Sequence, residues 1–336
     1  MKVGSAMKLM FVGDINLGEY YTNFGNGPGS YAQKKDVFEK VSHIFLNADL
    51  VAGNLEAALS TIGLDPSEPE SLVLRAKPET AKLLQKNNIR LVQVANNHTV
   101  QHGAPAFQEC LQILKEHDIA FTGLNNADPT IVTINGKTIG FLAASDVPDN
   151  TDKQQNLYQR LDEKFLIHVE NCAKKVDYLI VMLHWGLEES TTPLEYQREI
   201  AKRLKKTGVK IVIGSHPHLF YEIEANDDFV CAYSLGNFVF DLCWDKRLLK
   251  TGILEVTIDE AGKMQSSVWP VLIQEHGALP SPRGDRLEVN QKIKLYELGH
   301  DMKNQQIKKL IYHTSNLFRG NTKMKAIFLR RKILKF

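Results

Sequence analysis

The feature that most constrains this chain is a set of five short apolar segments, each ending on a cluster of Gly, Asp, Asn, Glu or His. Short apolar runs bounded in this way are typical of buried strands. Because α/β proteins bind ligands beyond the carboxyl ends of their strands, the pattern predicts an α/β protein with one shared site. The segments and their polar residues are 8–12 with Asp14, 49–52 with Asn54 and Glu56, 89–95 with Asn97 and His98, 178–183 with His184, and 209–213 with His216 and His218.

These clusters combine carboxylate oxygens with imidazole nitrogens. That mixture suits Zn, Mn or Fe better than Ca or Mg alone, and without a cysteine it argues against a closed structural zinc site. His216 and His218 are separated by one residue, so in an extended segment their side chains would point the same way and could serve adjacent metals. Two metals about 4 Å apart can activate a water and stabilise the leaving oxygen in a displacement at phosphorus. The clusters therefore favour phosphoester chemistry.

Four further residues are candidates for contacts around this site, and each has an alternative interpretation. Arg75 can reach an anionic substrate from a loop, or it can be a solvated loop charge. Glu188 can contact the site, or it can be a charge at a helix N-terminus. Asn54 can bind a metal directly, or it can form a left-handed turn that lets Glu56 approach the metal. Asn237 can support a ligand histidine through a hydrogen bond.

The motifs around these clusters, in their order along the chain, resemble those of the CapA family, the capsule or poly-gamma-glutamate synthesis proteins. The resemblance implies a fold like that of the metallophosphatases, which include the calcineurin-like phosphoesterases. That fold is a four-layer αββα sandwich with a two-metal site at one edge of its sheets. The motifs extend over about residues 8–275 and are Gly13-Asp14, Gly53-Asn54-Leu55-Glu56, Asn96-Asn97-His98, His184-Trp185-Gly186, Gly214-Ser215-His216-Pro217-His218 and Ser234-Leu235-Gly236-Asn237.

The resemblance also implies a role for each site residue. Glu56 resembles the carboxylate that bridges two divalent metals (Mn, Zn or Fe), and His98 resembles the neighbouring general acid. Asn16 occupies a ligand position where calcineurin-like phosphoesterases carry a histidine, and Gln101 stands where the CapA family often has an aspartate. The other implied ligands are Asp14 and His218 for the first metal, and Asn97, His184 and His216 for the second.

The implied function is metal-dependent hydrolysis of a phosphoester or related anionic group during capsule, poly-gamma-glutamate or other cell-surface polymer synthesis. The expected substrate is an anionic small molecule or polymer. The alternative is a non-hydrolytic component of a polymer-synthesis or amide- or ester-forming complex, which binds an anionic polymer through its metal pocket. Asn16 and Gln101 support this alternative, because both depart from the usual arrangement of acid and metal ligands.

The C-terminal end of the chain differs from the rest in charge. Of 41 Lys and Arg residues, ten lie in residues 302–336, whereas none of the 39 Asp and Glu residues does. We expect one domain over residues 1–275 and an extension over residues 276–336, of which residues 326–336 form a basic amphipathic helix. Two interpretations stay open, namely peripheral contact with an anionic membrane through residues 323–336 and docking onto the acidic body.

Composition argues against several other classes of protein. No run of about 18 apolar residues is present, so no membrane-spanning helix is expected. The apolar run in residues 1–12 is too short for a secretion signal, so we expect a cytoplasmic protein, with a possible peripheral position at the inner membrane surface. The four cysteines form no C-x-x-C pair, which argues against a zinc knuckle or a disulfide framework. A nucleic-acid partner is not expected, because no recognised nucleic-acid fold accompanies the basic residues.

Overall fold

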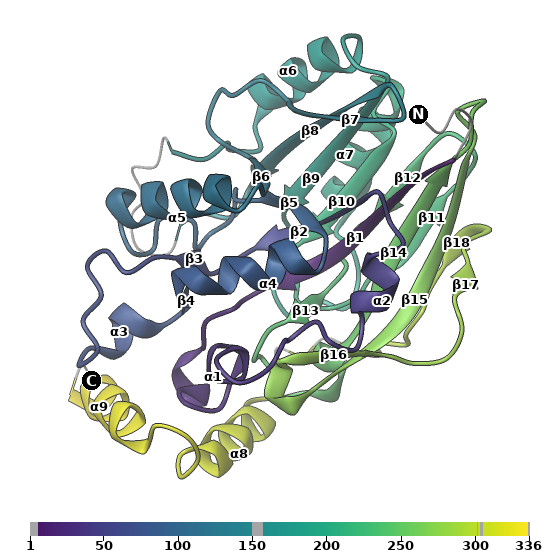
Figure 1. The fold of residues 1–336 in the computed structure, drawn as a ribbon. Coiled ribbons are helices and arrows are strands. Elements are labelled where there is room, and N and C mark those ends of the chain that lie inside the picture. Colours follow the sequence, from purple (N-terminus) through teal and green to yellow (C-terminus); the bar gives the residue numbers. More distant parts are fainter. Residues whose placement is uncertain (1–5, 150–156, 301, 303–304, 335–336) are drawn as a thin grey trace.

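The computed structural model describes residues 6–149, 157–300, 302 and 305–334 (Figure 1). A first sheet contains β1 Met7–Ile15, β2 Leu50–Leu55, β5 Ile89–Gln93, β6 Ala120–Thr122, β13 Asn237–Val239, β14 Lys250–Ile258, β15 Met264–Gln274, β16 Leu279–Pro282 and β17 Leu287–Glu288. Its order is β16-β15-β14-β1-β2-β5-β6, with β13 paired to β1 and β17 to β15. The strands β1, β2, β5 and β6 are parallel, whereas β14 pairs with β1 in the antiparallel direction.

A second sheet contains β7 Thr130–Ile134, β8 Lys137–Ser145, β9 Tyr178–His184, β10 Ile211–Ser215, β11 Ile223–Ala225, β12 Val230–Ala232 and β18 Gln291–Ile293. Its order is β18-β11-β12-β10-β9-β8-β7, and β8, β9, β10 and β12 are parallel. A small separate pair consists of β3 Ala58–Leu59 and β4 Arg75–Ala76.

Helices lie on the outer side of both sheets (Figure 1). Among them, α4 and α5 contact β5 and β6 of the first sheet, whereas α6 contacts β8 and β9 of the second sheet and α7 packs beside α6. The bounds are α1 Pro28–Ala32, α2 Ser42–Phe45, α3 Pro69–Leu72, α4 Ala81–Lys86, α5 Ala104–Glu116, α6 Glu163–Ala173, α7 Glu195–Lys206, α8 Gln306–Asn316 and α9 Thr322–Leu334.

The alternating side chains of β9 show how the layers are stacked. Ile180 and Met182 belong to the core that the two sheets share, whereas Leu179, Val181 and Leu183 pack into a second core with side chains of α6 and α7. This separation follows from the strand period of two residues, which sends successive side chains to opposite faces. The predicted four-layer αββα sandwich is confirmed.

The polar clusters meet at one edge of the sandwich because parallel strands of both sheets end there. In the first sheet Asp14 of β1 lies opposite Asn54 of β2 and opposite Asn237 of β13. In the second sheet His184 at the end of β9 lies opposite Ser215 at the end of β10. The register therefore aligns segments that are far apart in the sequence.

Gly13 allows two backbones to approach closely next to this edge. A Cβ atom on Gly13 would lie 1.8 Å from the carbonyl oxygen of Gly236. We expect Gly13→Ala to lower the free energy of unfolding by about 3 kcal/mol or more, because a backbone oxygen cannot move away as a side chain can. Urea unfolding measures this. The control is Gly63→Ala. No atom of the described residues lies within 4 Å of a Cβ added there, and the positive φ of 68° costs only about 1 kcal/mol. Equal losses in the two variants would contradict the steric explanation.

Both sheets continue beyond residue 275, where the sequence predicts the large domain to end. The strands β16 and β17 pair with β15, and β18 pairs with β11 of the second sheet. These strands satisfy backbone groups at the sheet edges that would otherwise lack partners. The body of the fold therefore extends through Ile293, and the extension is shorter than expected.

The described part of the extension docks onto the body. Phe328 of α9 stacks on Tyr21 with ring centroids 4.1 Å apart, and Met324 is buried. Arg331 pairs with the carboxylates of Glu68 and Glu70. The side chains of residues 332–336, part of the predicted amphipathic helix, lie outside the described residues. Within the described part of the chain, no helix combines the length and the apolar character needed to cross a membrane.

Candidate metal centre

Two buried carboxylates form the base of the site. Asp14 lies near the end of β1 and Glu56 directly follows β2, and both side chains are almost fully buried. The amide nitrogen of Asn54 lies between them and donates to Asp14 Oδ1 at 2.9 Å and to Glu56 Oε2 at 3.2 Å. Asn54 is part of β2, so the left-handed turn considered for it is not formed. Its side chain holds the two carboxylates at a fixed separation.

Three histidines face these carboxylates from the second sheet. His184 ends β9, and His216 and His218 follow β10. The ring centroids of His184 and His216 are 4.7 Å apart, and those of His216 and His218 are 6.1 Å apart. His216 and His218 have φ angles of 96° and 59°, so the extended segment expected for them is wrong. Positive φ at two nearby non-glycine residues is strained, and such strain is concentrated at functional sites.

Neighbouring side chains orient these histidines. His184 Nε2 lies 2.8 Å from Asn97 Oδ1, and its Nδ1 lies 3.0 Å from Ser215 Oγ. His218 Nδ1 lies 2.9 Å from Asn237 Oδ1, which is the kind of contact expected for Asn237. The imidazole rings are therefore held by partners on both sheets.

His98 lies on the loop after β5 and faces the carboxylates. Its Nε2 is 3.8 Å from Glu56 Oε1, and its Nδ1 is 2.6 Å from Gln101 Oε1. The Gln101 amide nitrogen donates to the carbonyl oxygen of Val73, so its oxygen is the atom turned toward His98. Burial lowers the pKa of His98 to about 4. Gln101 thus positions His98 through a neutral acceptor, at the place where the family often has an aspartate.

Burial and neighbouring charges shift the pKa values of this group in both directions. Burial, followed by the charge of Asp14, raises the pKa of Glu56 well above its usual range. Burial lowers the pKa of His184 far below its usual range and that of His216 to about 3. Burial also acts to lower the pKa of His218, but Glu56 and Asp14 outweigh it and raise that pKa to about 10. Burial and Asp14 thus disfavour the ionised form of Glu56, and a bound cation would offset both effects.

The donor atoms fit divalent metal ions. Glu56 Oε1 and His216 Nδ1 are buried and form no hydrogen bond within the described residues, whereas Asp14 Oδ2 lies 3.2 Å from His218 Nδ1. Ligand atoms of Asp14, Glu56 and His184 also lie within 4.8 Å of one another. Buried polar atoms without a partner are costly, and metal coordination satisfies them. Asp14, Glu56, Asn97, His184, His216 and His218 thus form a coherent oxygen and nitrogen donor set.

Two predicted site residues have other surroundings. Asn16 Oδ1 accepts from the backbone of Gly18, and its Nδ2 donates to Asp241 at 3.1 Å, so Asn16 anchors the loop after β1. Arg75 donates to the carbonyl oxygens of Ser60 and Ile62 and lines a different cavity, so the structure does not bring it to the carboxylates.

Asp241 is a buried residue near the site that the sequence interpretation missed. It accepts hydrogen bonds from Asn16 and from the backbone of Tyr20, and burial raises its pKa to about 7. An aspartate four residues after Asn237, in an otherwise apolar segment, was the signal in the sequence.

A cavity of about 210 Å³ leads to this centre. His98 and His218 line one part of it, and exposed Glu188 lines it as well. Helix α8 of the C-terminal extension contributes Lys309 and His313 to its wall. The sequence did not single out Lys309, because the ten basic residues of residues 302–336 have no distinguishing pattern. The extension thus forms part of the wall around the candidate site.

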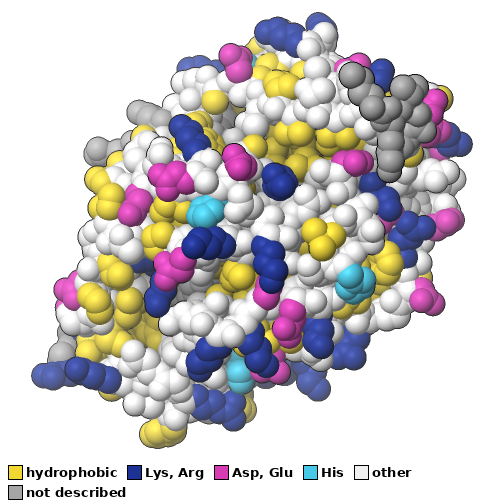
Figure 2. Space-filling model, viewed as in Figure 1, with side chains coloured by type: hydrophobic (Ala, Val, Ile, Leu, Met, Phe, Trp, Pro, Cys, Tyr) yellow, Lys and Arg dark blue, Asp and Glu magenta, His cyan; other side chains and the backbone are white. Residues whose placement is uncertain are grey.

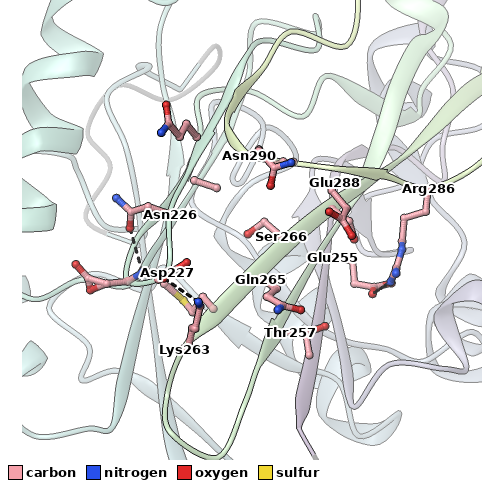
Figure 3. A pocket seen from close by; sticks show the side chains of 16 residues that line it. Asn226, Asp227, Glu255, Thr257, Lys263, Gln265, Ser266, Arg286, Glu288 and Asn290 are labelled. Carbon is pink, nitrogen blue, oxygen red and sulfur yellow. Dashed lines mark hydrogen bonds and ion pairs between the residues drawn. The ribbon is translucent and has the colours of Figure 1, made fainter.

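A larger cavity, of about 800 Å³, lies elsewhere (Figure 3). It opens between β14 and β15 of the first sheet and the β11–β12 turn of the second. Four of its charged side chains form two ion pairs, since Arg286 binds Glu255 at 2.5 Å and Lys263 binds Asp227 at 3.1 Å. Because these four side chains are already paired with one another, we place the candidate metal centre at the smaller cavity.

Comparison with known proteins assigns the family. Residues 8–242 match the family described as bacterial capsule synthesis protein PGA_cap. The chain belongs to the PGA_cap family. This member is 30% identical over 302 residues to the PGA biosynthesis protein CapA of Bacillus subtilis (strain 168), covering 87% of this chain and 77% of that protein. It is 28% identical over 300 residues to the capsule biosynthesis protein CapA of Bacillus anthracis, covering 85% and 71%. The predicted CapA relationship is confirmed.

Among solved structures, a 5'-nucleotidase from Candida albicans SC5314 aligns with this PGA_cap member at a TM-score of 0.45 and 11% identity, covering 95% of this chain and 58% of that one. The family assignment rests on the sequence matches alone.

Proposed function

We propose that this PGA_cap protein is a metal-dependent hydrolase that cleaves a phosphoester or a related anionic group, using a water activated by two divalent ions (Mn, Zn or Fe). The reaction would serve capsule, poly-gamma-glutamate or other cell-surface polymer synthesis. Capsule or PGA synthesis is named in the descriptions of the family and of both Bacillus relatives. Its substrate would be an anionic small molecule or polymer.

One observation carries the proposal. Glu56 Oε1 and His216 Nδ1 are buried without a hydrogen bond to any described residue, next to Asp14 and beside a cavity that is lined by His98 and His218. A mixed set of carboxylate and imidazole donors next to an accessible cavity suits catalysis better than a structural role. We assign Glu56 as the bridging ligand, Asp14 and His218 to the first metal, and Asn97, His184 and His216 to the second.

The metals and the residues around the cavity would have different roles in the reaction. When bound, the metals would supply Lewis acidity toward a phosphoryl oxygen and lower the pKa of a water molecule. His98 would exchange a proton with the leaving oxygen at Nε2, because its Nδ1 faces Gln101. Phe240 and Leu74 form apolar parts of the cavity wall and would limit the access of bulk water.

Metal analysis and a hydrolysis screen test this function. Protein purified without chelator is expected to contain stoichiometric Mn, Zn or Fe by elemental analysis, and to hydrolyse a model phosphodiester or monoester at neutral to alkaline pH. Removing the metal with EDTA is expected to lower the rate at least about 100-fold, and added Mn²⁺ or Zn²⁺ should restore it.

Two outcomes would contradict the proposal. Protein that binds no metal and hydrolyses neither ester would refute both the metal centre and the activity. Protein that binds metal at stoichiometric level but hydrolyses nothing would instead favour the non-hydrolytic component of a polymer-synthesis complex.

A further inference from the structure

One face of α8 is occupied by the body of the protein. Lys309 and His313 line the cavity next to the candidate metal centre. The Tyr312 hydroxyl donates to Asn23 Oδ1 at 2.9 Å, and Asn316 is buried. These positions recur every three or four residues, so they form a single inner face of the helix.

The opposite face of α8 carries a stripe of large apolar side chains. Ile307, Leu310 and Ile311 are 75%, 63% and 61% exposed, and Phe318 just beyond the helix is 88% exposed. Their spacing places them along one side of the helix and its continuation. No other helix or strand among the described residues exposes more than one large apolar side chain. A concentrated exposed patch of this kind marks an interaction surface.

Exposed basic side chains surround this stripe. Arg319 and Lys323 follow the C-terminal end of the helix, and both are exposed. Lys308, in the first turn, is also exposed and pairs with Asp245 at 3.3 Å. Residues 302–336 contain no Asp or Glu. Figure 2 shows dark blue Lys and Arg side chains along the lower part of the molecule, where Figure 1 places α8 and α9. An apolar stripe with a basic margin is typical of helices that lie on anionic membranes.

We propose that the outer face of α8, formed by Ile307, Leu310, Ile311 and Phe318, binds the surface of an anionic lipid bilayer. The helix lies in the plane of the interface, with its apolar side chains among the lipid chains and its basic residues near the headgroups. Basic side chains next to the apolar stripe favour a bilayer over a protein partner, because they are attracted to the negatively charged headgroups of anionic lipids.

The proposal changes which part of the extension meets the membrane. The sequence places this contact on residues 323–336, but Met324 is buried and Phe328 stacks on Tyr21. Met324 and Phe328 of α9 therefore pack against the body of the protein, whereas α8 exposes its apolar stripe to solvent. Because Lys309 on the inner face of α8 lines the cavity, contact through the outer face places that cavity beside the bilayer.

Vesicle sedimentation of the full chain tests the inference without reference to catalysis. Binding to vesicles of equimolar phosphatidylcholine and phosphatidylglycerol is expected to exceed binding to pure phosphatidylcholine at least about tenfold, and to weaken as salt is added. The variant Ile307→Ser/Leu310→Ser/Ile311→Ser is expected to lose at least about tenfold in partitioning. The matched control Ile131→Ser/Ile167→Ser, with side chains 50% and 49% exposed on β7 and α6, should bind as the wild type does.

A second pair of variants separates charge from apolar contact. Arg319→Gln/Lys323→Gln should weaken binding to the anionic vesicles about 25-fold, because each lost charge is expected to weaken it roughly fivefold. The control Lys82→Gln/Lys202→Gln should leave the binding unchanged. Phe318→Trp should show a blue-shifted emission on these vesicles. Undiminished binding by the triple serine variant would overturn the proposal, as would equal binding of the wild type to both vesicle types. A wild-type dimer in light scattering that the triple variant abolishes would overturn it too, by making this face a protein interface.

Discussion

Glu56→Gln is expected to abolish metal binding and hydrolysis while leaving the protein folded. Glu56 Oε1 is a buried atom without a hydrogen-bond partner in the described part of the chain, and we propose that this carboxylate would bridge both metals. Glutamine has nearly the same shape as glutamate but no charge. Metal affinity should therefore fall at least about 100-fold, which is more than the loss expected when a residue that only hydrogen-bonds a metal ligand is replaced. Isothermal titration with Mn²⁺ or Zn²⁺ and elemental analysis measure the loss.

The stability of the metal-free variant distinguishes this result from misfolding. Glu56 and Asp14 are two buried carboxylates of like charge, so removing one charge should leave the free energy of unfolding unchanged or increase it. Glu255→Gln is the matched control, because Glu255 is equally buried but pairs with Arg286 at the far cavity. It should destabilise the fold and retain the metal. Full metal binding by Glu56→Gln would refute the proposed centre.

His98→Ala is expected to retain the metal and to lose activity. We propose that His98 exchanges a proton with the leaving group, and such a residue contributes about 100- to 10,000-fold to the rate. The loss should appear in kcat, since His98 is not among the proposed ligands. Steady-state kinetics with a model ester, together with elemental analysis of the same preparation, measure both quantities.

Two neighbouring residues provide graded controls for His98. Gln101→Leu removes the oxygen that lies 2.6 Å from His98 Nδ1, so it should lower kcat about tenfold, less than His98→Ala does. His102→Ala should have little effect on activity, because His102 Nε2 contacts the carbonyl oxygen of Val73 rather than the cavity. If His102→Ala lost as much rate as His98→Ala, the assignment of the proton donor would be wrong.

The pattern of apolar segments and polar endings made an α/β fold and the position of the site predictable, whereas the four-layer arrangement was implied by the resemblance to the CapA family. Strand periodicity is local, and the carboxyl ends of parallel strands share an edge, so Asp14, Asn54 and His184 could be placed together without coordinates. The roles of individual atoms could not be predicted in this way. Asn54 separates two carboxylates instead of forming a turn, because that depends on side-chain directions in two paired strands.

Errors in the sequence interpretation arose where distant segments meet. Arg75 was considered as a substrate contact or as a solvated loop charge, but it is held by the carbonyl oxygens of Ser60 and Ile62. The strands after residue 275 were missed because they are short, and two of them are polar. Their pairing with β15 and β11, rather than their own propensity, makes them strands.

The amino-acid sequence by itself determined the family, the alternation of strands and helices, and the residue types available to bind metal. These follow from short-range patterns and from motifs kept in order along the chain. Only the tertiary structure decided which donor atoms have no hydrogen-bond partner among the described residues. It also decided that α8 places Lys309 in the cavity wall while it exposes Ile307, Leu310 and Ile311. The docking of α8 depends on contacts such as Tyr312 with Asn23, and no local pattern encodes pairings over so long a separation.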